Sequence, residues 1–265
     1  MDVGGRRALV TGASGGIGAA IARELHARGA TVLLSGRRGD VLEQLAAELG
    51  ERATVVPADL SSSEGVRALA EAAADVDVLV ANAALPGSGR LETFTPEEID
   101  RTIDVNLRAP VQLARELVPR MVERGSGHAV FICSMSGKIP TGGGSVYSAT
   151  KFGLRGFAAA LRDELHRTGV GVTTVFPGFV SEAGLFAETG IKLPPYVRLR
   201  SPRQVAQAVL RGIERGRAEI DVAPLPMRLS GWLAGIAPDQ VAAVGRRLGS
   251  RDVAERLAER QRLKR

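Results

Sequence analysis

The sequence has little of several residue types, and each shortage excludes a class of protein. Its 265 residues include one cysteine, Cys133, so no internal disulfide can form and a disulfide-rich secreted scaffold is excluded. No apolar run approaches the length of a membrane span, and residues 1–7 show no hydrophobic signal segment. We therefore expect a cytoplasmic protein in which Cys133 fills a buried strand.

Acidic residues are too few to balance the charge, and the positive excess is concentrated at one end. The net charge is +6, and residues 246–265 contain eight basic and three acidic residues, which supply +5 of it. The remainder of the chain is nearly neutral and has no basic stripe with interleaved aromatic residues. Because nucleic-acid surfaces need clustered cations, we expect no nucleic-acid partner.

Apolar residues, at 45% of the chain, are abundant enough to form one large core. Their spacing predicts strands near 7–11, 31–35, 53–57, 76–81, 128–134, 170–176 and 219–223. It predicts helices near 16–28, 40–49, 62–74, 95–123, 145–168 and 201–215. This alternation indicates an α/β fold with a Rossmann-like, doubly wound parallel sheet of about seven strands and helices on both faces. We expect one catalytic domain over 1–223 and a helical extension with a basic tail over 224–265.

A glycine-rich turn follows the first predicted strand and leads into an amphipathic helix. It reads TGASGGIG over residues 11–18. Gly12, Gly16 and Gly18 would let the backbone approach a pyrophosphate, whose charge the helix N-terminus favours. The glycine spacing is wider than the common G-x-G-x-x-G, and a purely structural loop is the alternative.

No carboxylate stands at the end of the second predicted strand, where an NAD enzyme has one about 20 residues after the first glycine. The sequence there reads Ser35-Gly36-Arg37-Arg38. Two guanidinium groups can bind an adenosine 2′-phosphate, so Arg37 and Arg38 predict NADP(H) as the preferred cofactor, with NAD(H) as a second choice. The alternative is that both arginines face solvent. Asp40 is predicted to cap the next helix.

Tyrosine and lysine are scarce, with two and four in the chain, yet Tyr147 and Lys151 stand four residues apart. That spacing places both on one face of the helix near 145–168. An ammonium group beside a phenol lowers the phenol pKa from about 10, which would make Tyr147 a general acid/base. Ser134 ends the strand near 128–134, at the edge where open α/β sheets bind ligands. An ordinary amphipathic helix is the alternative.

Together these motifs resemble the short-chain dehydrogenase/reductase family over about residues 6–223. The matching segments are the glycine motif at 11–18, Asp59, Ala81-Asn82-Ala83-Ala84 in place of Asn-Asn-Ala-Gly, Asn106 in DVNL, Ser134, Tyr147, Lys151 and Pro177-Gly178. The altered positions in 81–84 concern local backbone packing more than catalysis. In the family a threonine soon after Pro177-Gly178 would contact the nicotinamide carboxamide. This chain lacks that threonine and has Ser181 and Glu182 near the position.

The resemblance implies an oxidoreductase that transfers hydride between NADP(H) and a carbonyl or secondary alcohol. The implied catalytic residues are Asn106, Ser134, Tyr147 and Lys151. Tyr147 would donate the proton, and Lys151 would also bind the nicotinamide ribose. Asn106 would bend its helix and free a carbonyl for a water that links Lys151 to solvent, the alternative being a surface polar residue. Pro119 is predicted to kink or interrupt the same long helix.

The implied cofactor-binding residues, with Asp59 against the adenine ring, are Gly12, Ser14, Gly16, Ile17, Gly18, Arg37, Arg38, Asp59, Leu60, Asn82, Tyr147, Lys151, Pro177 and Gly178. No metal site is expected. Because family members commonly form dimers or tetramers, we expect a homodimer or homotetramer. A non-catalytic nucleotide sensor or scaffold is the alternative function. An epimerase or dehydratase is disfavoured, because such chains usually carry a larger C-terminal domain.

Two stretches near the C-terminus have no fixed counterpart in these motifs. Residues 178–200 are apolar without regular periodicity, which predicts a lid over a hydrophobic substrate, with packing on the body or a second subunit as the alternative. Leu229, Trp232, Leu233 and Ile236 recur at helical spacing and form one apolar stripe. We predict that the body or a second subunit covers this stripe. Contact with an anionic membrane, aided by the basic tail, is the alternative.

Overall fold

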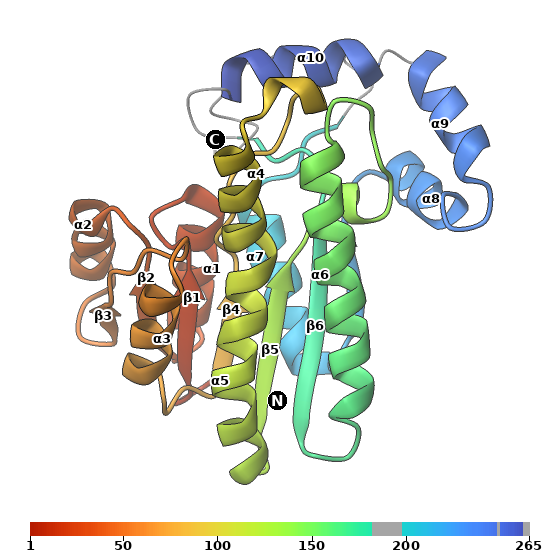
Figure 1. Ribbon diagram of the computed structural model, residues 1–265. Helices are drawn as coiled ribbons and strands as arrows, with labels where there is room; N and C mark the ends of the chain where they lie inside the picture. The colour runs from red at the N-terminus through yellow and green to blue at the C-terminus, as the bar shows by residue number, and fades with distance from the viewer. Residues whose placement is uncertain (182–197, 248–249, 262–265) are drawn as a thin grey trace.

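Seven parallel strands form one sheet in the order β3-β2-β1-β4-β5-β6-β7, with helices on both faces (Figure 1). The computed structural model describes residues 1–181, 198–247 and 250–261. The strands are β1 (Arg7–Thr11), β2 (Thr31–Ser35), β3 (Ala53–Val55), β4 (Val78–Ala81), β5 (Gly127–Ile132), β6 (Val170–Pro177) and β7 (Glu219–Val222). The predicted doubly wound parallel sheet is confirmed.

Ten α-helices are named in the described part of the chain. They are α1 (Gly16–Ala27), α2 (Gly39–Leu49), α3 (Ser63–Ala72), α4 (Pro96–Ile103), α5 (Ala109–Glu123), α6 (Ser145–Glu164), α7 (Pro202–Arg215), α8 (Leu225–Leu233), α9 (Pro238–Arg247) and α10 (Ser250–Gln261). The apolar residues of α1, α2 and α7 form one core with one face of the sheet, and those of α3, α5 and α6 form a second core with the other face.

The central strand β1 shows why both faces need cover. Ala8 and Val10 belong to one core, and Leu9 between them belongs to the other, as the alternation of a strand requires. All three are fully buried. A strand buried on both sides reads as a continuous apolar run, which is the pattern that the sequence has here.

Four strands are shorter than predicted: β4 begins at Val78 and β7 ends at Val222, one or two residues inside the predicted bounds, and β3 and β5 end earlier. β3 ends at Val55, because it is an edge strand that pairs only with three residues of β2. β5 ends at Ile132, so Ser134 lies just beyond the strand and caps η3, a short 3-10 helix over Met135–Gly137. Both segments still donate one backbone hydrogen bond to the neighbouring strand just past these ends, from Val56 to the Leu34 carbonyl and from Cys133 to the Val175 carbonyl.

The long helix predicted over 95–123 is divided into three parts. Between α4 and α5 lies η2, a π-helical turn over Asp104–Arg108 that contains Asn106. The prediction of an interruption at Pro119 is wrong, because α5 continues through this residue. Pro119 is exposed, so water can bond the carbonyl group that lacks its helical partner.

Asp40 does not cap α2, and that prediction is wrong. The cap residue is Arg38, without a side-chain hydrogen bond, and Asp40 lies within the first turn. A carboxylate in this position still stabilises the helix, because the first turn carries the positive end of the helix dipole.

A buried histidine ties β5 to β6 at the opposite end of the sheet from the predicted site. His128 Nε2 lies 2.8 Å from Thr173 Oγ1, and that hydroxyl donates to the Arg217 carbonyl at 2.6 Å. The histidine must therefore donate from Nε2. Burial, with smaller contributions from the N-terminal amino group and Arg162, lowers the pKa of His128 from 6.5 to about 4.

This histidine predicts acid sensitivity of the fold. As the pH falls below 6.5 the unfolded chain gains a proton that the folded chain takes up only near pH 4. The free energy of unfolding should therefore fall across this window, by about 3 kcal/mol in total. Chemical denaturation of His128→Gln should show a smaller loss between pH 6.5 and pH 4. The exposed His166→Gln is the control, and equal pH slopes in all three proteins would contradict the prediction.

Helices α8, α9 and α10 follow the last strand and lie along the upper side of the molecule in Figure 1. The stripe of Leu229, Trp232, Leu233 and Ile236 is exposed, with 68% of Trp232 accessible. The prediction that the body covers this stripe is therefore wrong, and cover by a second subunit stays a prediction. None of the helices among the described residues is both long and apolar enough to cross a bilayer.

Candidate active site

The predicted site residues gather at one edge of the sheet. Because all strands are parallel, their carboxyl ends lie together, and each motif directly follows or ends a strand. The residues at this edge are Gly12 after β1, Arg37 and Arg38 after β2, Asp59 after β3, Asn82 after β4, Ser134 after β5, and Pro177-Gly178 at the end of β6. The sheet order reverses between β1 and β4, which is where such folds open a ligand crevice.

The glycine-rich turn fits tightly between β1, α1 and the loop after β4. Gly12 has φ +66°, and a side chain there would come within 2.8 Å of the Ala83 backbone. A methyl group on Gly18 would overlap the Gly12 carbonyl and lie 2.8 Å from Asn82 Nδ2. No side chain caps the N-terminus of α1, whose first residue is Gly16. The turn therefore offers free N–H groups and a close backbone approach to a pyrophosphate.

Thr11 and Asn82 lock this turn, and the role of Thr11 was not predicted. The Thr11 hydroxyl accepts hydrogen bonds from the backbone N–H groups of Asn82 and Ala83, at 3.0 and 3.1 Å. The Asn82 amide donates to the carbonyl groups of Thr11 and Gly12, at 2.9 and 3.3 Å. A buried hydroxyl at the end of an apolar strand needs partners, and this requirement is the sequence signal that could have identified Thr11.

Arg37 and Arg38 lie on the β2 side of the turn, and both are exposed. Arg38 Nη2 donates to the Ser14 carbonyl within the turn, at 2.5 Å. The pKa of Asp59 is lowered, first by the backbone N–H of Ser61 and further by the positive charge of Arg37. The arginines thus border the adenosine end of the predicted nucleotide site. Of the other predicted contacts, Ile17 is partly buried and Leu60 is buried in the core.

Ser134, Tyr147 and Lys151 lie together where the carboxyl end of β5 meets the first turns of α6. The Ser134 side chain forms a hydrogen bond with Tyr147 and accepts another from the Ser136 N–H at 3.1 Å. Lys151, which is 1% exposed, donates from Nζ to the Ile132 carbonyl at 3.1 Å, and Nζ lies 5.5 Å from the Tyr147 ring centre. Serine and lysine thus approach the tyrosine from the end of β5 and from α6.

The protonation of this group differs from the prediction. Burial raises the pKa of Tyr147 above its ordinary value of 10, and the hydrogen bond from Ser134 offsets only part of that effect. Burial also lowers the pKa of Lys151. The predicted lowering of the tyrosine pKa is therefore wrong for the ligand-free chain, because desolvation of the phenolate outweighs its neighbours. Tyr147 is a protonated phenol at neutral pH.

Asn106 is buried, so the alternative of a surface residue is wrong. Its side chain pairs with the backbone of Leu85, accepting from the N–H at 2.7 Å and donating to the carbonyl at 2.9 Å. Two residues on, Gly87 packs so closely on α6 that a side chain there would lie 3.0 Å from Tyr147 Cβ. Asn106 therefore holds the loop that covers the tyrosine.

These positions match a known family. The family model described as short chain dehydrogenase matches residues 6–191. The chain belongs to the short-chain dehydrogenase family. It is 35% identical over 267 residues to the ketoacyl reductase HetN of Nostoc sp., covering 96% of this chain and 93% of that protein.

Two solved structures show the same fold as this short-chain dehydrogenase. A short-chain dehydrogenase from Sphingobium yanoikuyae in complex with NADPH has a TM-score of 0.77 at 30% identity, covering 88% of this chain and 96% of the other. A 3-ketoacyl-(acyl-carrier-protein) reductase from Brucella melitensis complexed with NADH has a TM-score of 0.75 at 28% identity, covering 83% and 97%.

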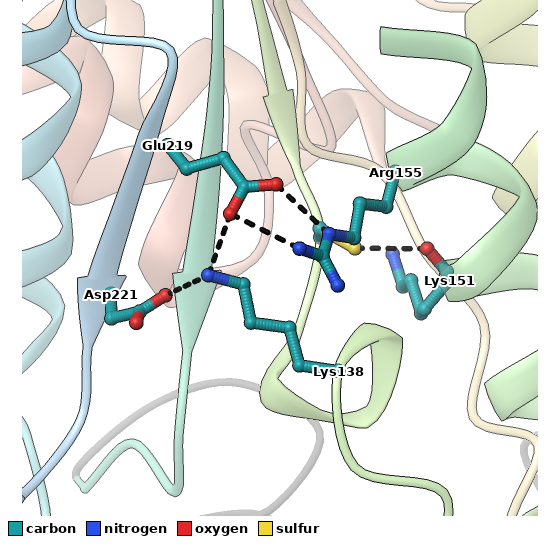
Figure 2. Close-up of polar contacts among 6 residues, drawn as sticks. Lys138, Lys151, Arg155, Glu219 and Asp221 are labelled. Carbon is teal, nitrogen blue, oxygen red and sulfur yellow. Dashed lines mark hydrogen bonds and ion pairs between the residues drawn. The ribbon is translucent and has the colours of Figure 1, made fainter. Parts of the chain in front are cut away.

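A charged cluster fastens the segment that contains Lys138 to the edge strand β7 of this short-chain dehydrogenase (Figure 2). Lys138 Nζ lies 2.8 Å from Glu219 and 2.6 Å from Asp221, and 4.0 Å above the Phe176 ring. Arg155 of α6 binds Glu219 at 2.9 Å. The sequence did not predict this cluster, because the carboxylates lie some 80 residues beyond Lys138.

Cys133 and the predicted lid complete the surroundings of this short-chain dehydrogenase site. Cys133 is buried as predicted, and its thiol donates to the Lys151 carbonyl at 3.1 Å. Only the ends of the predicted lid are described, and the Ser181 N–H donates to the Arg200 carbonyl at 2.8 Å. Glu182 and the apolar lid residues Leu185, Phe186, Ile191, Leu193 and Tyr196 lie outside the described residues. No cluster of possible metal ligands occurs among the residues that are described.

Proposed function

We propose that this dehydrogenase transfers hydride between NADP(H) and a carbonyl or secondary alcohol, with Tyr147 as the general acid/base. The observation that carries the proposal is the protonated, partly buried Tyr147 bonded to Ser134, at the edge where the glycine turn would hold the dinucleotide. When bound, the reduced nicotinamide supplies the hydride. The chain itself must bind the carbonyl oxygen, stabilise its growing negative charge and deliver a proton.

The residues divide this work by position. Ser134 and Tyr147 would both donate hydrogen bonds to the carbonyl oxygen, which stabilises the charge that develops there. Tyr147 would then release its proton to that oxygen, and the buried ammonium of Lys151 would stabilise the phenolate left behind. Asn106 would keep the covering loop on Tyr147 through Leu85. In the reverse direction the same groups would remove a proton from an alcohol.

The glycine turn and the arginines support NADP(H) as the preferred cofactor, with NAD(H) as a second choice. The turn has no room for side chains at Gly12 and Gly18, as close approach of a pyrophosphate requires. Arg37 and Arg38 can supply guanidinium groups to a 2′-phosphate, and Asp59 would contact the adenine ring. The complexes of related enzymes with NADPH and NADH agree with both parts of this proposal.

Replacing Arg37 tests this cofactor preference. Arg37→Asp should reduce the preference for NADPH over NADH about tenfold, because a repelling charge replaces one exposed phosphate partner. The ratio of the two dissociation constants, measured by nucleotide fluorescence, gives the result. Arg115→Asp, at an exposed arginine of α5, is the matched control. Equal constants for NADPH and NADH in the wild type would contradict the assignment of the arginines.

We further propose an apolar substrate, a homodimer or homotetramer, and a cytoplasmic location. The apolar composition of the predicted lid supports the substrate class.

Members of the family commonly form dimers or tetramers, which supports the proposed oligomer. Light scattering would test the oligomeric state. A single, buried, reduced cysteine supports a reducing compartment. A panel of ketones, aldehydes and secondary alcohols with NADPH or NADP⁺ would identify the substrate class, and activity on small polar carbonyls alone would contradict the apolar assignment.

A further inference from the structure

Helix α8 contacts the body through Gly231 and the partly buried Met227, and exposes its leucines and its tryptophan. Gly231 is buried, and a methyl group there would lie 2.9 Å from Met135 Cε. On the opposite side Leu225, Leu229 and Trp232 are 62%, 52% and 68% exposed. Large apolar side chains normally face a core, so this orientation indicates a surface that another apolar phase covers.

Arginine side chains border this apolar face. A cavity of about 460 Å³ beside α8 is lined by Arg211, Arg215, Arg217 and Arg228, together with Lys138, Glu219 and Asp221. The two carboxylates already bind Lys138 and Arg155. In the part of the chain that the structure describes, no carboxylate forms an ion pair with any of the four arginines. The cavity therefore has an unbalanced positive charge that fits phosphate groups.

Arg228 joins the two features, because it stands on α8 itself. It lies three residues after Leu225 and four before Trp232, so it borders the apolar face on the side of the cavity. The positive character continues along the chain, where the exposed Arg246 and Arg247 end α9 beside the half-exposed Val244. Helices α8 and α9, which carry these apolar and cationic residues, lie at the periphery of the molecule (Figure 1).

We propose that this α8 surface, made by Leu225, Leu229, Trp232, Ile236 and the four arginines of the cavity, binds an anionic phospholipid bilayer. The apolar residues would enter the acyl boundary, and the guanidinium groups would bind lipid phosphates. Tryptophan favours such an interface, because it combines a large apolar ring with a polar N–H. A second copy of the chain fits less well, since a two-fold contact would bring two copies of the same net positive surface together.

The only tryptophan of the chain, Trp232, reports directly on the proposed contact. Full-length protein is mixed with vesicles of phosphatidylcholine containing phosphatidylglycerol, or with phosphatidylcholine alone. We expect the emission of Trp232 to shift to shorter wavelength with the anionic vesicles only. The protein should sediment with these vesicles at low salt and be released as salt rises, because the phosphate contacts are screened.

Paired variants separate the apolar and electrostatic parts. The double variant Arg211→Gln with Arg228→Gln should weaken vesicle binding by about tenfold or more. The control is Arg67→Gln with Arg115→Gln, which changes two exposed arginines on α3 and α5 and should leave vesicle binding unchanged. Leu229→Ser with Ile236→Ser should abolish the emission shift, whereas Leu91→Ser, at another exposed leucine, should not. Both tests replace exposed side chains, and NADPH binding of each variant verifies that it is folded.

Three results would overturn the proposal. The first is an absence of both sedimentation and emission shift with anionic vesicles. The second is vesicle binding that leaves the emission of Trp232 unchanged, or an emission shift that inorganic phosphate alone also produces. Either result would show an ion site without apolar insertion. The third is a vesicle-free oligomer that Leu229→Ser with Ile236→Ser dissociates, which would assign the α8 surface to a second copy of the chain.

Discussion

Tyr147→Phe should lower turnover by at least about 100-fold while the fold and NADPH binding remain intact. The substitution removes one hydroxyl and keeps the partly buried residue that packs against the loop at Gly87. Without the hydroxyl, the group that the proposal assigns as proton donor to the carbonyl oxygen is gone. Steady-state rates with NADPH, together with the dissociation constant of NADPH, give the comparison.

The only other tyrosine of the sequence provides the control. Tyr196→Phe should keep most of the wild-type turnover, because the account gives its hydroxyl no proton to transfer. If Tyr147→Phe turned over at nearly the wild-type rate, another group would have to be the proton donor. If it lost NADPH binding as well as turnover, its effect would be structural, and the experiment would not support a chemical role.

Gly18→Ala should raise the dissociation constant of NADPH by at least about tenfold, which corresponds to about 1.4 kcal/mol. The added methyl group would overlap the Gly12 carbonyl and crowd Asn82, so the turn that approaches the pyrophosphate must open. Helix propensity alone predicts the opposite effect on stability, because alanine in a helix is favoured over glycine by about 1 kcal/mol. A lowered melting temperature would therefore show that steric overlap outweighs propensity.

Gly15→Ala is the matched control for this turn. A methyl group at Gly15 would lie 3.4 Å from the Gly12 carbonyl, which is an ordinary contact, and the residue has an extended backbone at φ −93°. This variant should bind NADPH almost as tightly as the wild type. Equal losses from Gly15→Ala and Gly18→Ala would contradict the assignment of the close approach to Gly18.

The sequence predicts the sheet and the location of the site well, for one physical reason. Parallel strands buried on both faces are apolar runs, and the motifs that follow them must lie at one edge. Gly12, Asn82 and Ser134 could be placed in this way although 122 residues separate the first from the last. Helix spacing was enough to place Lys151 beside Tyr147.

Features that depend on distant partners could not be predicted. The turn at Asp104–Arg108 lets Asn106 reach the backbone of Leu85, a requirement invisible in the local pattern. Lys138 pairs with carboxylates of β7. The raised pKa of Tyr147 follows from burial by the whole fold, which outweighs the hydrogen bond from Ser134. Periodicity also predicted the stripe on α8 without its direction, because a stripe that faces outward has the same spacing as one that faces a core.

The alternative of a nucleotide sensor or scaffold shares every feature of the cofactor site. It differs in the need for a proton donor, because a protein that only binds the nucleotide gains nothing from a protonated phenol bonded to a serine. The two functions therefore make the same prediction for NADPH binding and different predictions for chemistry.

Hydride transfer itself is the most direct test of the central claim. Purified wild-type protein is incubated with NADPH deuterated at the carbon that gives the hydride, together with apolar ketones and aldehydes, and the alcohols are analysed by mass spectrometry. The account predicts alcohols that carry deuterium on the carbinol carbon, and their loss in Tyr147→Phe. Tight NADPH binding without deuterium in any product, across the whole panel, would contradict it and favour the sensor.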